Sequence, residues 1–581
     1  MLDDIGAGRA ARRAIARARG AGLRVEQARF FAGHLKLPDG ESAYLAAFRQ
    51  STPVAMRAAR ARVGESRVLT ALAAEWPRTP MEIRLARQLW WPVMEALLRV
   101  RAAQVLAGGG PCRVIAARPA GVRAEELDAG AGVQWYDADR RGARTDRFVL
   151  AWWIRQRARG VTAPKPEIGR RGLPIVLAPQ EEEIEADLTF RTQPHWRSTT
   201  PRLDAVIAAT DVFGAGDAAP GAGLSFVRPD AVHGLPGTPV TAAATRAGLR
   251  IARAALSAGR DETPALGAAA RLFYFGGRVA ALAAASGARV FVCCESPMIH
   301  ADAAQLVARK AGIRTVCFQY SNMGHVTPVM KSCADVFASF APIYHERWQW
   351  DGWDGECRPV GYPYDYAFPE LRRRAAAHRE ALAARGARFV IAYFDESVQH
   401  DKWGLIHPDD HVRELGMLLR RVIDDGAFGL VLKNQFQRNA ATKVASLTPL
   451  LAAARETGRL LELSHGRQRN RVFPAEAALA ADITIGHAVG ATASLEAVLA
   501  GTRAVLLNPY GYRGANDAMY ARADIVYPDL ERALAAIDRW RAGDPAAAAV
   551  GDWSGIADAF DAFRDGLGAA RLEELLLELA S

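Results

Sequence analysis

The chain has 581 residues, half of them hydrophobic and 24% charged, which is the composition of a globular protein. A chain of this length is too long for one hydrophobic core, so two or three domains are expected. No run of about eighteen apolar residues occurs, which excludes a membrane-spanning helix, and the acidic and then arginine-rich start does not read as a secretory signal.

The first 110 residues are predicted to be helical and basic. They hold 18 lysines and arginines against 9 aspartates and glutamates, which is most of the surplus behind the net charge of +11. Apolar residues at helical spacing predict helices at residues 9–19, 52–76 and 80–107. This basic region either contacts an anionic membrane surface or forms ordinary solvated helix faces.

From residue 111 the pattern changes to short apolar runs that are typical of parallel strands. Candidate strands lie at residues 112–117, 133–136, 174–177, 224–227, 290–294, 315–319 and 336–340. Their alternation with ten-residue helices predicts a doubly wound sheet, so residues 111–365 are assigned to a first Rossmann-like domain. The six cysteines are scattered without zinc-finger spacing, and we interpret them as reduced core residues of a cytoplasmic protein.

A second series of strands and helices begins near residue 366. Candidate strands lie at residues 389–393, 429–433, 460–463, 483–485, 504–507 and 524–526, and helices at 370–385, 410–424, 441–457, 475–480 and 494–500. Residues 366–581 are therefore assigned to a second Rossmann-like domain with terminal helices. The predicted fold class is α/β, with two doubly wound parallel-sheet domains, an N-terminal helical region and a ligand site between the domains.

The turn between the strand at 483–485 and the helix at 494–500 is a candidate ligand site. Such a turn lies beyond the carboxyl end of a parallel strand, where a helix N-terminus offers free N–H groups to phosphate. The turn and the helix start hold small, hydroxyl-bearing or ionisable residues, namely Gly486, His487, Gly490, Thr492, Ser494 and Glu496. The alternative is a plain structural turn with Thr492 or Ser494 as the N-cap.

Four segments in order carry a family resemblance. They are VGYPYDYAF (360–368), RFVIAYFDES (388–397), GLVLKNQFQRN (429–439) and ITIGHAVGATASLEAVLAGTRAVLLN (483–508). The set resembles the two-Rossmann-domain (GT-B) glycosyltransferases of bacterial surface polysaccharide synthesis, and within them the groups related to Kdo transferases and CDP-glycerol glycerophosphotransferases. The resemblance covers about residues 290–530.

The resemblance implies a donor site in the second domain. Lys433, together with Gly490, Thr492 and Ser494, would hold the leaving phosphate, Glu496 would bind a ribose hydroxyl, and His487 would contact phosphate or base. Each of three residues also has a structural alternative. Lys433 would be a lysine at a strand end that reaches solvent, Glu496 would stabilise a helix N-terminus, and His487 would be a core histidine. The sequence departs from the family pattern at two places. Lys433 lacks the histidine that usually follows it, and Tyr320-Ser321 stand where relatives often have His-Gly.

The acceptor side and the general base are expected at the strand ends of both domains. Glu295 and His325 are the candidate bases in the first domain, and Asp395 and Glu396 are their counterparts in the second. The loop at residues 318–326 is dense in hydrogen-bonding groups. The expected acceptor-side residues are His300, Gln319, Ser321 and Asn322.

No metal ion and no other cofactor is expected. The resemblance implies a transferase that handles the phosphate without metal, and we interpret Asp137 and Asp139, which have the spelling of a metal-binding Asp-x-Asp motif, as a surface turn. The segment His407-Pro-Asp-Asp-His411 also has residue types that could bind a metal ion, but we interpret it as a helix start with Pro408 at the first position. Neither a Walker phosphate loop nor a Gly-x-Ser-x-Gly motif occurs.

The sequence therefore predicts a cytoplasmic glycosyltransferase that moves a sugar from a nucleotide-activated donor to a surface polysaccharide or a lipid-linked acceptor. Its basic N-terminal region would let it lie peripherally on the inner face of the cytoplasmic membrane, and no nucleic-acid partner is expected. Two alternative enzyme activities stay open, transfer of glycerol phosphate from CDP-glycerol and epimerisation of a nucleotide sugar. A non-catalytic GT-B-like module that binds polysaccharide or partner proteins is the third alternative.

Overall fold

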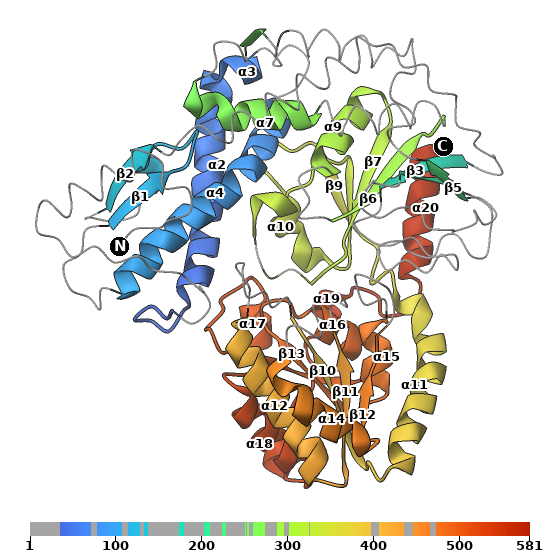
Figure 1. The fold of residues 1–581 in the computed structure, drawn as a ribbon. Helices are drawn as coiled ribbons and strands as arrows, with labels where there is room; N and C mark the ends of the chain where they lie inside the picture. The colour runs from blue at the N-terminus through green and yellow to red at the C-terminus, as the bar shows by residue number, and fades with distance from the viewer. Residues whose placement is uncertain are drawn as a thin grey trace, which may run out of the picture.

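The structure is a computed structural model, shown as a ribbon in Figure 1. It describes residues 35–70, 78–106, 114–127, 133–137, 173–178, 203–208, 224–227, 250, 253–254, 259–272, 287–295, 301–322, 324, 326–396, 406–434, 445–464 and 472–581. The predicted helix at residues 9–19 and the candidate residues His300 and His325 lie outside these ranges.

The second domain contains a six-stranded, fully parallel sheet in the order β12-β11-β10-β13-β14-β15. The strands are β10 (Phe389–Phe394), β11 (Phe428–Lys433), β12 (Leu460–Glu462), β13 (Ile483–His487), β14 (Arg503–Leu507) and β15 (Val526–Tyr527). Chain order reverses between β10 and β13, which creates the switch point where doubly wound sheets bind ligands.

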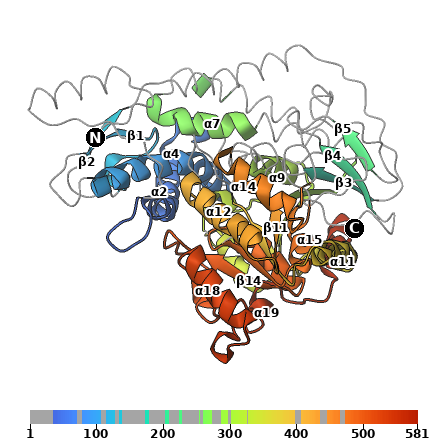
Figure 2. The same cartoon turned by 60° about the horizontal axis from the view of Figure 1, so that its bottom comes forward.

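Helices cover both faces of this sheet (Figures 1 and 2). They are α11 (Phe368–Ala384), α12 (Pro408–Asp424), α14 (Thr448–Glu456), α15 (Pro474–Leu479), α16 (Thr492–Leu499), α17 (Asp517–Tyr520), α18 (Leu530–Arg541) and α19 (Ala557–Phe560). Ile391 and Tyr393 of β10 pack with α12, α14 and α18, whereas Val390 and Ala392 pack with α11, α15 and α16. Burial on both faces explains why these strands read as continuous apolar runs.

The first domain contains a seven-stranded parallel sheet in the order β5-β4-β3-β6-β7-β8-β9. The strands are β3 (Leu173–Ala178), β4 (Leu203–Ala208), β5 (Leu224–Val227), β6 (Val290–Cys294), β7 (Arg314–Phe318), β8 (Val336–Ser339) and β9 (Glu356–Pro359). Its switch point lies between β3 and β6. The prediction missed two strands. One is β4, and the other is β9, an edge strand with the sequence ECRP that carries no apolar signal.

The N-terminal helices pack directly on the first domain. They are α2 (Ala43–Glu65), α3 (Arg67–Thr70) and α4 (Arg78–Leu106), and the parallel pair β1 (Val114–Arg118) and β2 (Val133–Asp137) follows them. Helices α7 (Thr263–Arg271), α9 (Ala301–Lys310) and α10 (His345–Trp348) complete this layer, with α7 lying across α4 in Figures 1 and 2.

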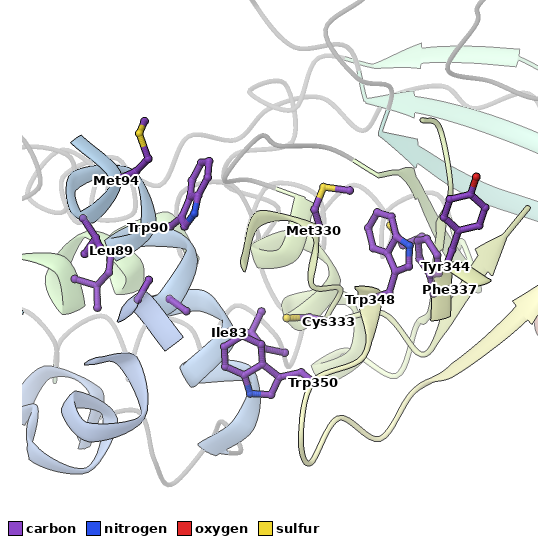
Figure 3. Packing of buried hydrophobic residues seen from close by; sticks show 14 of the residues in the cluster. Ile83, Leu89, Trp90, Met94, Met330, Cys333, Phe337, Tyr344, Trp348 and Trp350 are labelled. Atoms are coloured by element: carbon purple, nitrogen blue, oxygen red, sulfur yellow. The ribbon is translucent and has the colours of Figure 1, made fainter. Parts of the chain in front are cut away.

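Aromatic and aliphatic side chains join the N-terminal helices to the first sheet in one hydrophobic core (Figure 3). Ile83 of α4 lies beside Trp350, and the rings of Trp348 and Phe337 stack with centroids 3.9 Å apart. Arg84 of α4 is fully buried and pairs with Asp302 of α9 at 2.9 Å. This arginine of the basic region therefore has a structural role rather than a surface one.

Helix α2 begins earlier than the predicted residue 52. Ser42 caps it, since its hydroxyl accepts a hydrogen bond from the N–H of Leu45 at 3.1 Å. Pro53 lies inside the helix instead of starting it. Among the described residues, no helix is both long and apolar enough to span a bilayer.

The C-terminal helix α20 (Gly568–Ala580) returns to the first domain, beside β6 in Figure 1. Its residues Leu572, Leu575 and Leu576 pack against Val290 and Val292 of β6. The predicted boundary at residue 365 separates the two sheets, but by packing this last helix is part of the first domain. The predicted class, two doubly wound α/β domains preceded by helices, is confirmed.

Candidate functional site

The switch point of the second sheet is surrounded by ionisable side chains. Asp395 and Glu396 directly follow β10, and His487 is the last residue of β13, not part of the turn after it. Asp395 and His487 are buried, whereas Glu396 is half-buried. The backbone at Gly490 lies against the Glu396 carboxylate, so the two strand ends and the turn after β13 meet in one place.

Helix α16 starts at this switch point with backbone donors that no side chain caps. Ala491, the residue before the helix, has a left-handed conformation with φ of 44°, which is uncommon for a residue with a Cβ atom. The Ser494 hydroxyl in the first turn is buried and has no hydrogen-bond partner in the described structure. An uncapped helix start with an unsatisfied hydroxyl is suited to binding an anion.

His487 is held from behind by a carboxylate. Its Nε2 lies 3.1 Å from Oε2 of Glu414 on α12, and the same oxygen accepts a hydrogen bond from the Tyr393 hydroxyl at 2.7 Å. Burial lowers the pKa of His487, but the neighbouring charges of Glu414, Glu396 and Asp395 outweigh it and hold the pKa above its ordinary value. The pKa of Glu414 is lowered despite its burial, because His487 and Tyr393 stabilise the carboxylate.

Lys433 and Glu496, two predicted donor residues, lie in different surroundings. Lys433 ends β11, the strand next to β10, and is 7% exposed. Glu496 is fully buried, and its two carboxylate oxygens accept hydrogen bonds from the Tyr362 hydroxyl at 2.7 Å and from the N–H of Ala475 at 2.9 Å. This carboxylate joins the interdomain segment to α15, and the ribose contact predicted for it stays a prediction.

Glu295 occupies the switch point of the first sheet, directly after β6. It is buried and accepts hydrogen bonds from the Ser321 hydroxyl and from the N–H of Tyr320, the latter at 3.2 Å. Burial raises the pKa of Glu295 to about 8, although these hydrogen bonds oppose the shift. The carboxyl group is therefore protonated at neutral pH unless a ligand changes its surroundings.

The loop after β7 joins the two switch points. Gln319 shapes this loop, since its side chain accepts from the N–H of Phe340 at 2.8 Å and donates to the carbonyl of Ser321 at 2.9 Å. Ser321 holds Glu295, and the N–H of Asn322 donates to the hydroxyl of Thr492, the first residue of α16, at 2.9 Å. Thr492 therefore contacts the first domain.

A buried polar network continues from Asn322 across the domain interface. Its side chain accepts from the Tyr344 hydroxyl at 2.8 Å and from Asn516 at 3.1 Å, and donates to the Tyr520 hydroxyl at 3.1 Å. Asn516 in turn accepts from the buried Arg347 at 2.7 Å. These contacts fix the loop that carries Ser321.

Sequence reasoning missed several residues of this region, namely Tyr344, Arg347, Glu414, Asn516 and Tyr520. Glu414 could have been found, because it lies three residues after His411 on a predicted helix and so on the same helical face. That helix does begin at Pro408, as predicted, with His407 accepting from the N–H of Asp409 at 3.2 Å. Arg347 and Asn516 carried no comparable signal, since only the tertiary structure brings them together.

A cavity of about 180 Å³ lies elsewhere, between α2, α4 and α7. Its charged lining residues pair with one another, for example Arg118 with Asp261 at 3.2 Å and Arg123 with Glu65 at 3.2 Å. This pairing leaves the cavity without the uncapped donors of the interdomain site. Within the described ranges, no group of three or more histidine, cysteine, aspartate or glutamate side chains is arranged to hold a metal ion.

No protein-family model and no curated protein matches this chain. Among solved structures, the wall teichoic acid polymerase TagF is similar at 11% identity, over 76% of this chain and 98% of that one, with a TM-score of 0.42. A UDP-forming α,α-trehalose-phosphate synthase from Burkholderia xenovorans has 12% identity over 70% and 99%, with a TM-score of 0.39. Alr3699/HepE from Anabaena, solved with UDP and glucose, has 12% identity over 70% and 100%, with a TM-score of 0.39.

Proposed function

We propose that this chain is a glycosyltransferase that moves a sugar from a nucleotide-activated donor to a surface polysaccharide or a lipid-linked acceptor. One observation carries the proposal. The loop that holds Glu295 through Ser321 also binds the first residue of α16 through Asn322. A titratable carboxyl group of one domain and an uncapped helix start of the other thus belong to one interdomain site, as group transfer from a phosphate requires.

The proposed donor half is the second domain. The phosphate that leaves with the nucleotide would be bound by the free N–H groups of α16, the Ser494 hydroxyl and His487. Lys433 would add positive charge at the end of β11, which lies two strands from β13. We propose that these groups stabilise the leaving phosphate without a metal ion. Retention of turnover in excess EDTA is the expected result, and its loss would contradict this part.

The proposed acceptor half uses the carboxyl groups that face the donor. The acceptor hydroxyl oxygen attacks the anomeric carbon, the bond from that carbon to the phosphate oxygen breaks, and a carboxylate takes the hydroxyl proton. Glu295 in its charged form is the proposed base, and Asp395 and Glu396 would bind acceptor hydroxyls. Because the pKa of Glu295 in the unliganded protein is about 8, the charged form that acts as the base becomes more abundant as pH rises. Turnover should therefore rise with pH up to about that value.

The decisive experiment measures the melting temperature of the full chain against CMP, CDP, UDP, GDP and ADP. A ligand that binds only the folded state raises the melting temperature with its affinity, so one nucleotide should give a clear shift. A shift with CDP alone would favour transfer of glycerol phosphate. No shift with any nucleotide would contradict the proposal and favour the non-catalytic binding module.

The variant Ser494→Ala sharpens this test. An unsatisfied buried hydroxyl costs stability, so its removal should leave the unliganded protein as stable or more stable. If Ser494 contacts the donor phosphate, the same change should weaken nucleotide binding by about ten- to a hundredfold, the usual worth of one hydrogen bond to a charged group. Unchanged affinity would remove Ser494 from the donor site.

We also propose that the protein associates peripherally with the inner face of the cytoplasmic membrane. Several exposed arginines of α2 and α4 are paired with carboxylates, for example Arg49 with Glu41 and Arg78 with Glu82, so we assign this association to residues 1–34, which hold seven arginines. Salt-sensitive binding to vesicles that contain anionic lipid should disappear when residues 1–34 are removed. Equal binding by the shortened chain would refute it.

A further inference from the structure

Three buried side chains from three elements meet behind the switch point of the second sheet. Tyr393 on β10 and His487 on β13 both contact Oε2 of Glu414 on α12, at 2.7 and 3.1 Å. The side chains of His487 and Glu414 are 1% and 3% exposed. Because a carboxylate only accepts hydrogen bonds, its contact requires that Nε2 of His487 carries a proton.

The other ring nitrogen of His487 is unsatisfied. Nδ1 is buried and has no hydrogen-bond partner in the part of the chain that the structure describes. The carbonyl of His487 meanwhile accepts from the N–H of Ala491 at 3.0 Å, which closes the turn before α16. A buried polar nitrogen without a partner costs free energy, and a ligand at this turn would remove that cost.

The charges around His487 favour its cationic form. Glu414 on α12 and Asp395 and Glu396 after β10 all act on it with negative charge, and they hold its pKa above the ordinary value. His411 of α12 stacks on Tyr393 with ring centroids 6.2 Å apart, and Lys433 ends the neighbouring strand β11. In the cationic form both ring nitrogens donate, so Nδ1 becomes a donor.

We propose that Glu414, held by Tyr393, is a positioning residue that fixes the His487 imidazole through Nε2 and thereby presents an Nδ1–H donor to a phosphate oxygen of the ligand bound at α16. This inference rests on the proposed function, because it concerns the donor's phosphate. It adds a second layer of residues to the site, and Glu414 acts only through His487.

The test measures affinity for UDP, CDP and inorganic pyrophosphate by calorimetry on the full chain at about pH 7.5 and pH 5.5. Glu414→Gln should weaken binding about tenfold at the higher pH, because the substitution removes the negative charge of Glu414 that keeps His487 protonated. At the lower pH the variant should regain much of the lost affinity, because acid and the remaining charges of Asp395 and Glu396 then favour the protonated form of His487. Loss of the same size at both pH values would indicate a merely structural role and overturn the proposal.

Two further variants keep the test interpretable. His487→Gln should lose affinity at both pH values. Tyr393→Phe leaves the Glu414 carboxylate in place and should give a weaker form of the Glu414→Gln pattern, so it serves as the test variant if Glu414→Gln does not fold. The matched control is Glu476→Gln. It breaks another histidine–glutamate contact of 3.1 Å, between Glu476 on α15 and His378 on α11, and should leave affinity unchanged.

The ligands separate failure of the inference from failure of the proposed function. If wild type binds a nucleotide and Glu414→Gln binds it equally well at about pH 7.5, only the positioning role fails. If wild type binds pyrophosphate in a Glu414-dependent way but no nucleotide, the positioning role survives and the proposed function fails. If it binds neither, both fail.

Discussion

At the scale of single residues, the candidate site contains buried ionisable groups whose surroundings shift their pKa values in opposite directions. Glu295 is held in its protonated form by burial, with a pKa of about 8, whereas Glu414 is held in its charged form by His487 and Tyr393. Strongly shifted pKa values of buried groups are concentrated at functional sites, which makes each of these two carboxyl groups a candidate. Glu295 also has a measurable consequence for stability.

Glu295→Gln should change how stability depends on pH. The ordinary glutamate pKa is 4.5 and the folded value is about 8, so between these values the folded protein holds a proton that the unfolded chain has released. The stability of wild type should therefore fall, relative to that of the variant, as pH rises from about 5 to about 8. Urea unfolding midpoints at several pH values measure this difference. Parallel pH profiles for the two proteins would show that Glu295 is not buried as described.

At the scale of elements, the unit β13–turn–α16 brings together a strand end, a strained turn and an uncapped helix. A glycine is needed at position 486, because a Cβ atom there would overlap the Ser494 hydroxyl. Ala491 completes the turn with a positive φ of 44°. Strained backbone of this kind persists where the surrounding structure holds it, and it is concentrated at ligand sites.

Gly486→Ala should destabilise the protein by about 1–3 kcal/mol, the usual cost of overpacking a buried site. Ser494→Ala removes the atom that the new methyl group meets, so the double variant should regain most of that loss. Unfolding of the single and double variants in urea measures the coupling, which should be clearly non-additive. Additive effects would show that Gly486 and Ser494 are not in contact.

At the scale of the whole molecule, several features of the described residues tie the two sheets together. The chain crosses between them near residue 365, α20 returns to the first sheet, and the network around Asn322 and Asn516 bridges the interface. The network is buried and each of its amide groups has a partner, which favours one fixed arrangement of the two domains. The loop that holds Glu295 depends on it.

Asn516→Ala should lower stability by about 1.5–3 kcal/mol, because the buried Arg347 loses an acceptor at 2.7 Å. The matched control is Asp39→Asn, which weakens the exposed contact of Asp39 with Arg513 at 3.5 Å between the N-terminal segment and the second domain. That control should change stability by less than about 0.5 kcal/mol. Equal effects of the two changes on the urea midpoint would contradict a special role for the buried network.

The amino-acid sequence by itself determined the fold class and most strand positions. Continuous apolar runs such as Phe389–Phe394, which are short for helices, predict strands buried on both faces, and their alternation with helices predicts a doubly wound sheet. It also predicted that the turn before α16 lies at the carboxyl edge of the sheet, which makes that turn a candidate site.

Only the tertiary structure decided which side chains are partners. The carboxylate of Glu496, predicted to reach the donor, is enclosed between Tyr362 and Ala475, and the carboxylate of Glu414, which no motif marked, holds His487. Local patterns report which face of an element is apolar, but a polar contact depends on residues from distant segments meeting within about 3 Å. For the same reason, the return of α20 to the first sheet could be seen only once the elements were packed.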